Sequence, residues 1–307
     1  MNEILVVGSV ALDTVRTPFG EAVDALGGSA SYFAFSASHF APVRIVAVVG
    51  EDFPVEHRET FSRRGVELSG LQSAPGRTFR WRGEYAAELG HAHTLETQLN
   101  VFSTFHPALD DVHRGCDFVF LANIDPDLQL EVLDQMTRPR LALSDTMNYW
   151  IARKPERVMD VMRRVDVALL NEEEARALSG ETQLVRAAGR LLELGARSVI
   201  VKKGEHGSIY RSRDELFVIP AFPVSGLQDP TGAGDSFAGG FLGWLARSGR
   251  PEGPVLRQAM AFGTAMASLA IEAFSPARLV AARGEEIAER VATLHRMVDF
   301  ELETSFP

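Results

Sequence analysis

Residues 229–242 read Asp-Pro-Thr-Gly-Ala-Gly-Asp-Ser-Phe-Ala-Gly-Gly-Phe-Leu, a glycine-rich loop followed directly by a predicted helix. Pro230 disfavours helical conformation at the residue before it, and Gly232 and Gly234 allow a tight turn and a close approach to a ligand. After Asp235, apolar residues recur at helical spacing at positions 237, 241, 244 and 245. Because a helix start offers free N–H groups at the positive end of the helix dipole, the segment predicts an anion site, most naturally for phosphate.

Asp235 is unusual beside such a site, because a carboxylate and a bound phosphate repel each other. A general base explains its position, since the hydroxyl that gives up the proton must lie next to the phosphorus that it attacks. A lone Gly-x-Gly-Asp could equally hold an acidic residue that complements the helix dipole. The chain contains no Gly-Lys pair of a Walker A loop, and its glycine spacing is not the Gly-x-Gly-x-x-Gly of a dinucleotide fold.

Residues 229–242 resemble the C-terminal signature of the ribokinase-like (PfkB) carbohydrate kinase family, Asp-x-x-Gly-Ala-Gly-Asp followed by a helix of small residues. The resemblance spans nearly the whole chain. It implies an α/β fold: a three-layer, doubly wound sheet of mostly parallel strands with a small β-strand lid. It also implies an enzyme that uses ATP and Mg²⁺ to phosphorylate an alcohol group of a small sugar, nucleoside or cyclitol. In such an enzyme Asp235 is the catalytic base, and the amides of Gly232, Ala233 and Gly234 neutralise charge on the transferring phosphoryl group.

The composition is consistent with a kinase of small molecules. The net charge of −10 argues against nucleic acid or an anionic membrane as the partner. No apolar run reaches membrane-spanning length, and the first residues lack the pattern of a signal peptide. A single cysteine, Cys116, suits a reducing compartment, so we expect a cytoplasmic protein.

Buried strands and helices alternate along most of the chain. Strands are predicted at 3–8, 43–49, 117–121, 139–144, 165–170 and 197–202, with helices near 29–40, 127–136, 155–164, 172–178, 183–194, 253–272 and 283–297 and a tail at 298–307. This alternation indicates a parallel sheet with right-handed crossovers. Residues 76–102 instead mix polar with aromatic or apolar side chains, which is typical of short antiparallel strands. With the resemblance, we expect a main kinase domain (1–13, 25–75 and 103–307) and a β lid (14–24 and 76–102).

The expected acceptor site begins at Asp13, just past the first strand, where open α/β sheets bind ligands. Alone, Asp13 could be a turn residue, but in the family an Asp at this point accepts hydrogen bonds from substrate hydroxyls. The family's paired glycines, here Gly27 and Gly28, let the backbone approach the substrate. Four residues later the family's sugar and nucleoside kinases commonly carry Asn, whereas this chain has Tyr32, as cyclitol kinases of the family do. Tyr32 is therefore either a substrate contact that disfavours ribose or a packing residue.

Asn171 and Glu174 resemble a second family motif, Asn-x-x-Glu, which helps to hold magnesium and water around the phosphates. They could equally be a helix cap with an acidic first turn, and the two interpretations are compatible. Asn123 and Asp145 follow predicted strand ends, so we expect them beside the acceptor. The expected nucleotide-binding residues are Asn171, Lys203, Gly204, Gly207, Thr231, Gly232, Gly234, Phe262 and Gly263, and the expected metal-binding residues are Glu174, through water, and Asp229.

Two other classes of function were weighed against a kinase. A non-catalytic nucleotide-binding or sensory protein on the same fold would not need Asp235, Asn171 and Glu174 together, since a sensor requires no base. A dinucleotide-dependent dehydrogenase would need a glycine fingerprint that the chain lacks. The expected ligands are therefore ATP and a small-molecule acceptor. Lid strands leave unpaired edges when isolated, which makes a homodimer through the lid possible.

Overall fold

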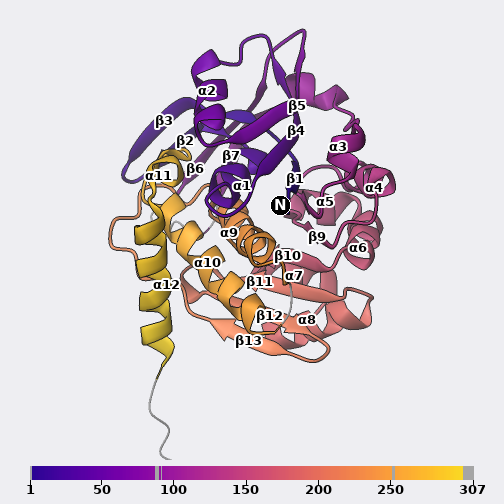
Figure 1. Cartoon of the computed structure of the whole chain (residues 1–307), viewed down its shortest axis with the longest axis vertical. Helices are drawn as coiled ribbons and strands as arrows, with labels where there is room; N and C mark the ends of the chain where they lie inside the picture. Colours follow the sequence, from indigo (N-terminus) through magenta and orange to yellow (C-terminus); the bar gives the residue numbers. More distant parts are fainter. Residues whose placement is uncertain (1, 87–89, 91, 251–252, 300–307) are drawn as a thin grey trace, which may run out of the picture.

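A nine-stranded sheet forms the centre of the computed structural model, which describes residues 2–86, 90, 92–250 and 253–299 (Figure 1). Its strand order is β13 (Leu216–Ile219), β12 (Ser208–Ser212), β11 (Ser198–Lys202), β10 (Val167–Asn171), β9 (Leu141–Ser144), β8 (Phe118–Leu121), β1 (Ile4–Val7), β4 (Val43–Gly50) and β5 (Val66–Ala74). Neighbours from β5 to β11 pair in parallel, and β11–β12 and β12–β13 pair antiparallel. The predicted sheet of mostly parallel strands is confirmed.

Each central strand contributes to two hydrophobic cores because successive side chains point to opposite faces. In β1, Ile4 and Val6 enter one core, and Leu5 and Val7 enter the other. The first core also includes residues of α1 (Ser29–Ala37), α2 (Val55–Arg63), α9 (Ala233–Ser248), α10 (Pro254–Ala270), α11 (Ala277–Ala281) and α12 (Gly284–Val298). The second includes residues of α4 (Pro126–Gln135), α5 (Asn148–Arg153), α6 (Pro155–Arg164), α7 (Glu172–Ser179) and α8 (Leu184–Glu193). The three-layer architecture follows from this division.

The predicted strands and helices agree with these elements to within a few residues. The strands β5 and β13 and the short helices α5 and α11 were not predicted. Of these, β5 is an edge strand that the sequence pattern did not reveal. Its burial alternates irregularly, and Ser69, Gly70 and Gln72 interrupt its apolar residues. An edge strand packs against fewer neighbours, so its sequence carries a weaker pattern than a central strand. Short α3 (Asp111–Arg114) was also not predicted.

A second, four-stranded sheet has the order β3 (Gly20–Gly27), β2 (Ala11–Thr17), β6 (Phe79–Tyr85) and β7 (Ala92–Gln98), and we call it the lid sheet. β2 pairs antiparallel with β3 and parallel with β6, and β6 pairs antiparallel with β7. Asp13 and Gly27 lie within these strands. Asp13, Val15 and Thr17 are buried, and the Thr17 hydroxyl donates to the carbonyl of Gln228 at 2.9 Å. The face of the lid sheet that carries Asp13 therefore lies towards the loop before α9.

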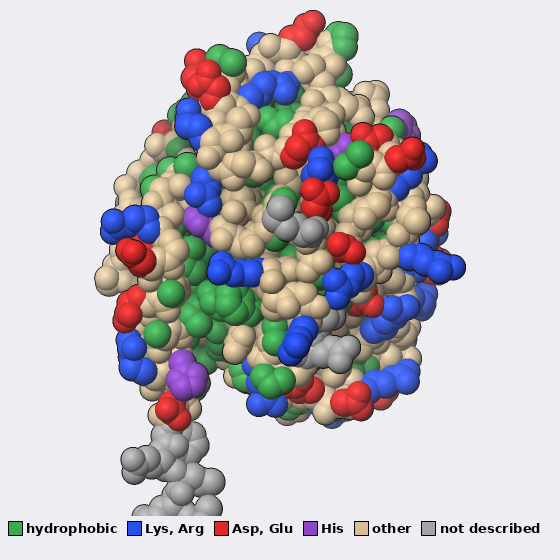
Figure 2. Space-filling model, viewed as in Figure 1, with side chains coloured by type: hydrophobic (Ala, Val, Ile, Leu, Met, Phe, Trp, Pro, Cys, Tyr) green, Lys and Arg blue, Asp and Glu red, His purple; other side chains and the backbone are tan. Residues whose placement is uncertain are grey.

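Charged side chains of both signs are interspersed on the side of the molecule shown in Figure 2. Within the described residues, the helices are too short or too polar to span a bilayer. Part of the predicted lid range, residues 87–89 and 91, lies outside the described residues, as do residues 300–307 of the predicted tail.

Candidate active site

The loop before α9 has the geometry of an anion site. Gly232 adopts a φ of 75°, which favours glycine, and α9 begins at the next residue. The N–H of Ala233 donates to the carbonyl of Pro230 at 3.3 Å. The N–H groups of Gly232 and Gly234 make no hydrogen bond to any residue that the structure describes. Two backbone donors therefore remain available at the positive end of the helix dipole.

Asp235 lies in the first turn of α9, partly buried. Burial, followed by the negative charge of Asp145, raises the pKa of Asp235 to about 8, although Lys202 acts in the opposite direction. The charge of Asp13 adds to the increase. A carboxyl group with a pKa near neutrality can exchange a proton with a hydroxyl at physiological pH, which suits a general base.

Lys202, the last residue of β11, forms an ion pair with Asp145 at the end of β9. The ammonium nitrogen lies 2.5 Å from Asp145 Oδ2, and the two side chains are only 18% and 6% exposed. Burial by itself lowers the pKa of Lys202, but Asp145 and Glu174 more than offset this, and the pKa is raised. A Cβ atom at Gly234 would lie 2.9 Å from this nitrogen. The lysine therefore contacts the glycine loop as a cation.

Lys203 was predicted from the sequence to contact the nucleotide, whereas Lys202 was not predicted as a site residue. Lys203 lies beyond the end of β11, is partly exposed, and its N–H donates to the carbonyl of Gly207 at 2.8 Å. Side chains alternate between the two faces of the sheet along β11, and this alternation could have distinguished Lys202 from Lys203. Ile200 packs in the same core as α9, so Lys202, two residues later, projects to that face of the sheet.

Asn171 and Glu174 form a capping box at the start of α7. The Glu174 N–H donates to Asn171 Oδ1 at 2.9 Å, and the Asn171 N–H donates to Glu174 Oε2 at 2.7 Å. Glu174 is 4% exposed, and burial and the charge of Asp145 raise its pKa to about 7. Asn171 also pairs with Lys202 in the sheet. The pair thus caps the helix and adds a carboxylate beside Lys202, so both interpretations of the motif remain open.

On the lid side, Asp13 Oδ2 accepts the N–H of Gly28 at 3.3 Å. Burial raises the pKa of Asp13 to about 7, with the Gly28 bond opposing the shift and the charge of Asp229 adding to it. A Cβ atom at Gly27 would lie 1.9 Å from Asp13 Oδ2, and Gly28 has a φ of 91°. The absence of a side chain at Gly27 therefore leaves room for the Asp13 carboxylate, and Gly28 supplies its backbone donor.

Tyr32 is 3% exposed, and its ring packs against Gly232, where a Cβ atom would lie 2.3 Å from the ring carbons. Burial and the charges of Asp229 and Asp13 hold the pKa of the Tyr32 phenol well above its usual value. The phenol is therefore neutral and can donate a hydrogen bond. One face of the ring is used in packing, and the hydroxyl lies among carboxylates.

Asp229 is 1% exposed, and its Oδ1 accepts the N–H of Thr231 at 2.9 Å. Its Oδ2 is buried without a close hydrogen-bond partner among the described residues, although the backbone N–H of Ser275 approaches the carboxyl group and acts to lower its pKa, against the increase caused by burial. A buried carboxylate oxygen in this state has capacity for a cation or a hydroxyl donor. The hydroxyls of Tyr85, in the lid sheet, and Thr231 lie 3.1 Å apart, which joins the lid sheet to this loop.

Two other predicted site residues, Asn123 and Phe262, contact different neighbours. Asn123 Nδ2 donates to Met147 Sδ at 3.1 Å, and Asn123 Oδ1 is buried without a partner in the described structure. Phe262 stacks on Trp244, with ring centroids 3.8 Å apart. Trp244 is nine residues beyond Asp235 on α9, about 13 Å along the helix axis. Phe262 therefore belongs to an aromatic cluster near the far end of α9.

The remaining predicted glycines have packing or turn roles. Gly263 packs against Phe237 of α9, where a Cβ atom would lie 2.8 Å from the Phe237 carbonyl oxygen. Gly204 and Gly207 form the turn between β11 and β12, with φ of 53° and 81°. A Cβ atom at Gly207 would lie 2.0 Å from the carbonyl oxygen of Ile219. The turn therefore keeps its backbone free of side chains at these two positions.

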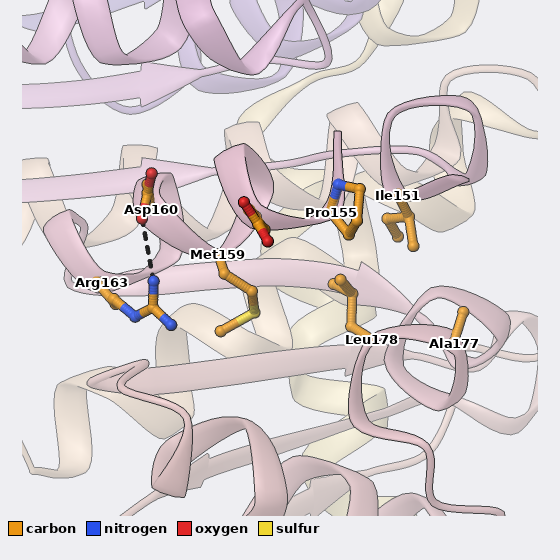
Figure 3. A pocket seen from close by; sticks show the side chains of 8 residues that line it. Ile151, Pro155, Met159, Asp160, Arg163, Ala177 and Leu178 are labelled. Atoms are coloured by element: carbon orange, nitrogen blue, oxygen red, sulfur yellow. Dashed lines mark hydrogen bonds and ion pairs between the residues drawn. The ribbon is translucent and has the colours of Figure 1, made fainter. Parts of the chain in front are cut away.

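A separate cavity of about 490 Å³ lies on the other side of the sheet (Figure 3). It is lined by Ile151, Pro155, Glu156, Met159, Asp160, Arg163, Ala177 and Leu178, none of which is a predicted site residue. Within the described ranges, no three His, Cys, Asp or Glu side chains are grouped closely enough to hold a metal ion by themselves.

The model of the pfkB family carbohydrate kinases matches residues 1–281. The chain is 31% identical over 258 residues to the cytidine kinase of Thermococcus kodakarensis, which covers 82% of this chain and 91% of that protein. The nucleoside kinase structure of Methanocaldococcus jannaschii superimposes with a TM-score of 0.77 at 20% identity, covering 95% of this chain and 99% of the other. A candidate ribokinase II from E. coli in complex with ATP and Mg²⁺ gives a TM-score of 0.78 at 19% identity, covering 95% and 100%.

Proposed function

The chain belongs to the pfkB family of carbohydrate kinases and is a sugar or nucleoside kinase, and we propose that it transfers the γ-phosphoryl group of ATP to a nucleoside hydroxyl. One observation carries the catalytic part of this proposal: Asp235 lies beside two glycine N–H groups that have no hydrogen-bond partner in the part of the chain that the structure describes. A bond forms between the acceptor oxygen and the γ-phosphorus, and the bond from that phosphorus to the β,γ-bridging oxygen breaks. The hydroxyl proton passes to Asp235, and ADP leaves.

Asp235 is the base in this proposal, and the amides of the 232–234 loop stabilise the charge of the transferring group. Asp13 accepts a hydrogen bond from an acceptor hydroxyl, and its bond to the Gly28 N–H fixes the carboxylate in place. Both carboxyl groups lie in one electrostatic cluster, since the charge of Asp13 affects the pKa of Asp235. The acceptor hydroxyl is thereby oriented between the lid sheet and the start of α9.

Mg²⁺ fits the donors that are present. Glu174 offers a buried carboxylate near Asp145, and Asp229 Oδ2 is a buried oxygen without a close hydrogen-bond partner in the described structure. Carboxylate oxygens are ligands that Mg²⁺ accepts, usually together with water and substrate phosphates. We propose that Glu174 acts through water and that Asp229 Oδ2 accepts a cation. When bound, Mg²⁺ supplies positive charge to the nucleotide phosphates.

A nucleoside is the proposed acceptor for two reasons. A relative that is 31% identical and covers 82% of this chain is named a cytidine kinase. In addition, Trp81 pairs with Asp13 across β2 and β6, so the half-buried Trp81 lies on the same face of the lid sheet as Asp13. Its ring lies over Gly83, where a Cβ atom would be 2.3 Å away, and its Nε1 donates to Thr94 Oγ1 at 3.2 Å. A flat, fixed indole beside the hydroxyl-binding Asp13 suits a nucleobase, which stacks well on aromatic rings.

The test is ADP release from ATP and Mg²⁺ with cytidine, uridine, adenosine, ribose, fructose and myo-inositol. We expect kcat/KM to be highest for a nucleoside and turnover to disappear without an acceptor. A clear preference for ribose, fructose or inositol would overturn the acceptor while leaving the kinase assignment in place. No ADP release with any acceptor, from protein that binds ATP, would favour a sensory protein on the same fold. We also expect the protein to work in the cytoplasm without nucleic acid.

A further inference from the structure

Lys202 is a positively charged side chain among several carboxyl groups. The charges of Asp145, Glu174 and Asp235 all act on it. ATP would bring several more negative charges to the same place. A nucleotide can bind beside these carboxylates only if cations compensate for the repulsion.

The position of the ammonium group relates it to the start of α9. Asp145 Oδ2 accepts from Lys202 Nζ at 2.5 Å. The same nitrogen lies against Gly234, 2.9 Å from the position of a Cβ atom there. An ammonium group has three donors, and the Asp145 bond uses one of them. Lys202 and the N–H of Gly234, which has no partner in the described structure, are thus two neighbouring hydrogen-bond donors for an anion, next to Asp235.

We propose that Lys202 binds the phosphoryl group that is transferred, and that Asp145 holds the ammonium group in position before the nucleotide binds. This assignment rests on the proposed function, in which ATP is the phosphoryl donor. The contact is to the γ-phosphoryl group because the base, Asp235, must lie within reach of the hydroxyl that attacks its phosphorus. The α- and β-phosphates lie farther from the base, so they have less contact with Lys202.

A purely structural role for Lys202 makes a different prediction. If the lysine only joins the ends of β9 and β11 through Asp145, its removal would weaken ATP and ADP binding by similar factors. A contact to the γ-phosphoryl group instead weakens ATP alone. The ratio of the two dissociation constants therefore separates the two roles.

The first experiment is calorimetric binding of ATP and of ADP, each with Mg²⁺ and without acceptor, to the wild type and to Lys202→Met. We expect Kd for ATP to rise about 10- to 100-fold, as for the loss of a hydrogen bond to a charged group. We expect Kd for ADP to change less than about threefold. Lys154→Met is the matched control, because Lys154 also pairs with carboxylates, Asp125 and Asp127, away from the glycine loop. It should leave both constants unchanged.

Three results would overturn the assignment. These are equal losses of ATP and ADP binding in Lys202→Met, no loss of either, or an ATP-specific loss in Lys203→Met but not in Lys202→Met. The first two leave the proposed function intact, provided the wild type binds ATP. Wild-type protein that binds neither nucleotide would overturn both the assignment and the proposed function.

A second experiment uses the wild type alone, so it holds even if Lys202→Met fails to fold. The chain contains three lysines, at 154, 202 and 203, so lysine labelled with ¹³C at Cε gives three side-chain signals. Spectra of Lys154→Met and Lys203→Met assign them. We expect ATP to move the Lys202 signal and ADP to move it much less. Equal shifts with both nucleotides, or a shift confined to Lys203, would overturn the assignment.

Discussion

The ring of Tyr32 lies against Gly232, so closely that a Cβ atom at position 232 would sit 2.3 Å from the ring carbons. Helix α1, which carries Tyr32, is therefore in direct contact with the loop before α9. A change at Tyr32 acts on the anion site as well as on any acceptor that its hydroxyl contacts.

Tyr32→Phe and Tyr32→Asn separate these two effects. Phenylalanine keeps the ring on Gly232, so we expect unchanged stability and, if the hydroxyl contacts the acceptor, a roughly tenfold lower kcat/KM for nucleosides. Asparagine removes the ring, so we expect the free energy of unfolding to fall by about 3 kcal/mol. We also expect a smaller ratio of kcat/KM for nucleosides to kcat/KM for ribose. Denaturant unfolding and acceptor kinetics on both variants provide the measurements. Wild-type kinetics in Tyr32→Phe would make Tyr32 a packing residue only.

Asp235→Asn should cut turnover by roughly 10²- to 10⁴-fold while ATP binding stays nearly intact, because only the proton acceptor is lost. Single-turnover kinetics and calorimetry measure the two effects. Asp134→Asn, in an exposed ion pair with Arg164, is a suitable control. Turnover close to that of the wild type in Asp235→Asn would falsify the role of the base.

The raised pKa of Asp235, about 8, also predicts a pH dependence of stability. The folded protein keeps a proton that the unfolded chain releases near pH 4, so the free energy of unfolding falls as pH rises from about 4 to about 8. Asp235→Asn removes this loss of stability, because asparagine has no carboxyl group to deprotonate. We expect the variant to be more stable than the wild type by about 1–3 kcal/mol at pH 8.5 and similar to it at pH 4. Equal stabilities at both pH values would contradict the raised pKa.

The same pKa bears on activity, because a base acts only when it is deprotonated. For the free enzyme we expect kcat/KM to rise with pH and to level off above about pH 8. The measurement is a pH profile of the rate with both ATP and the acceptor well below their KM values, so that the free enzyme predominates. An activity already constant from pH 6 upward would be inconsistent with a base of this pKa.

Glu174→Gln should raise the Mg²⁺ concentration needed for half-maximal activity by several-fold, because a buried carboxylate near the phosphates is lost. Glu172→Gln, in the same first turn of α7 but paired with Arg176, is the matched control. Metal titrations of both variants test this prediction. An unchanged titration of Glu174→Gln would leave Glu174 as a capping residue alone.

The outer strands of the lid sheet, β3 and β7, each have one neighbour in the described structure. Unpaired strand edges are usually covered, so we expect a homodimer through the lid sheet. Light scattering at working concentration measures the oligomeric state, and a charge reversal in β7, such as Glu96→Lys, should weaken a dimer. A fully active monomer would refute this prediction.

The sequence by itself determined the fold class and the centre of the site. The buried strands contain continuous apolar runs at 4–7, 118–121 and 199–201, and apolar residues of the helices between them recur at helical spacing, so the local pattern was sufficient to predict them. The residues of the 229–235 loop could be identified because glycine, proline and aspartate have specific backbone and charge effects there. The edge strand β5 and α3 have weak local patterns and were not found.

Tertiary structure alone decided which side chains meet. Lys202 and Asp145 are 57 residues apart in sequence, and only the pairing of β9, β10 and β11 brings them within 2.5 Å. Phe262 could face a nucleotide or another helix, and the contact between α9 and α10 places it on Trp244. Which of Lys202 and Lys203 lies on the α9 side of the sheet depends on where β11 ends, because one residue of shift turns a side chain to the opposite face of a sheet.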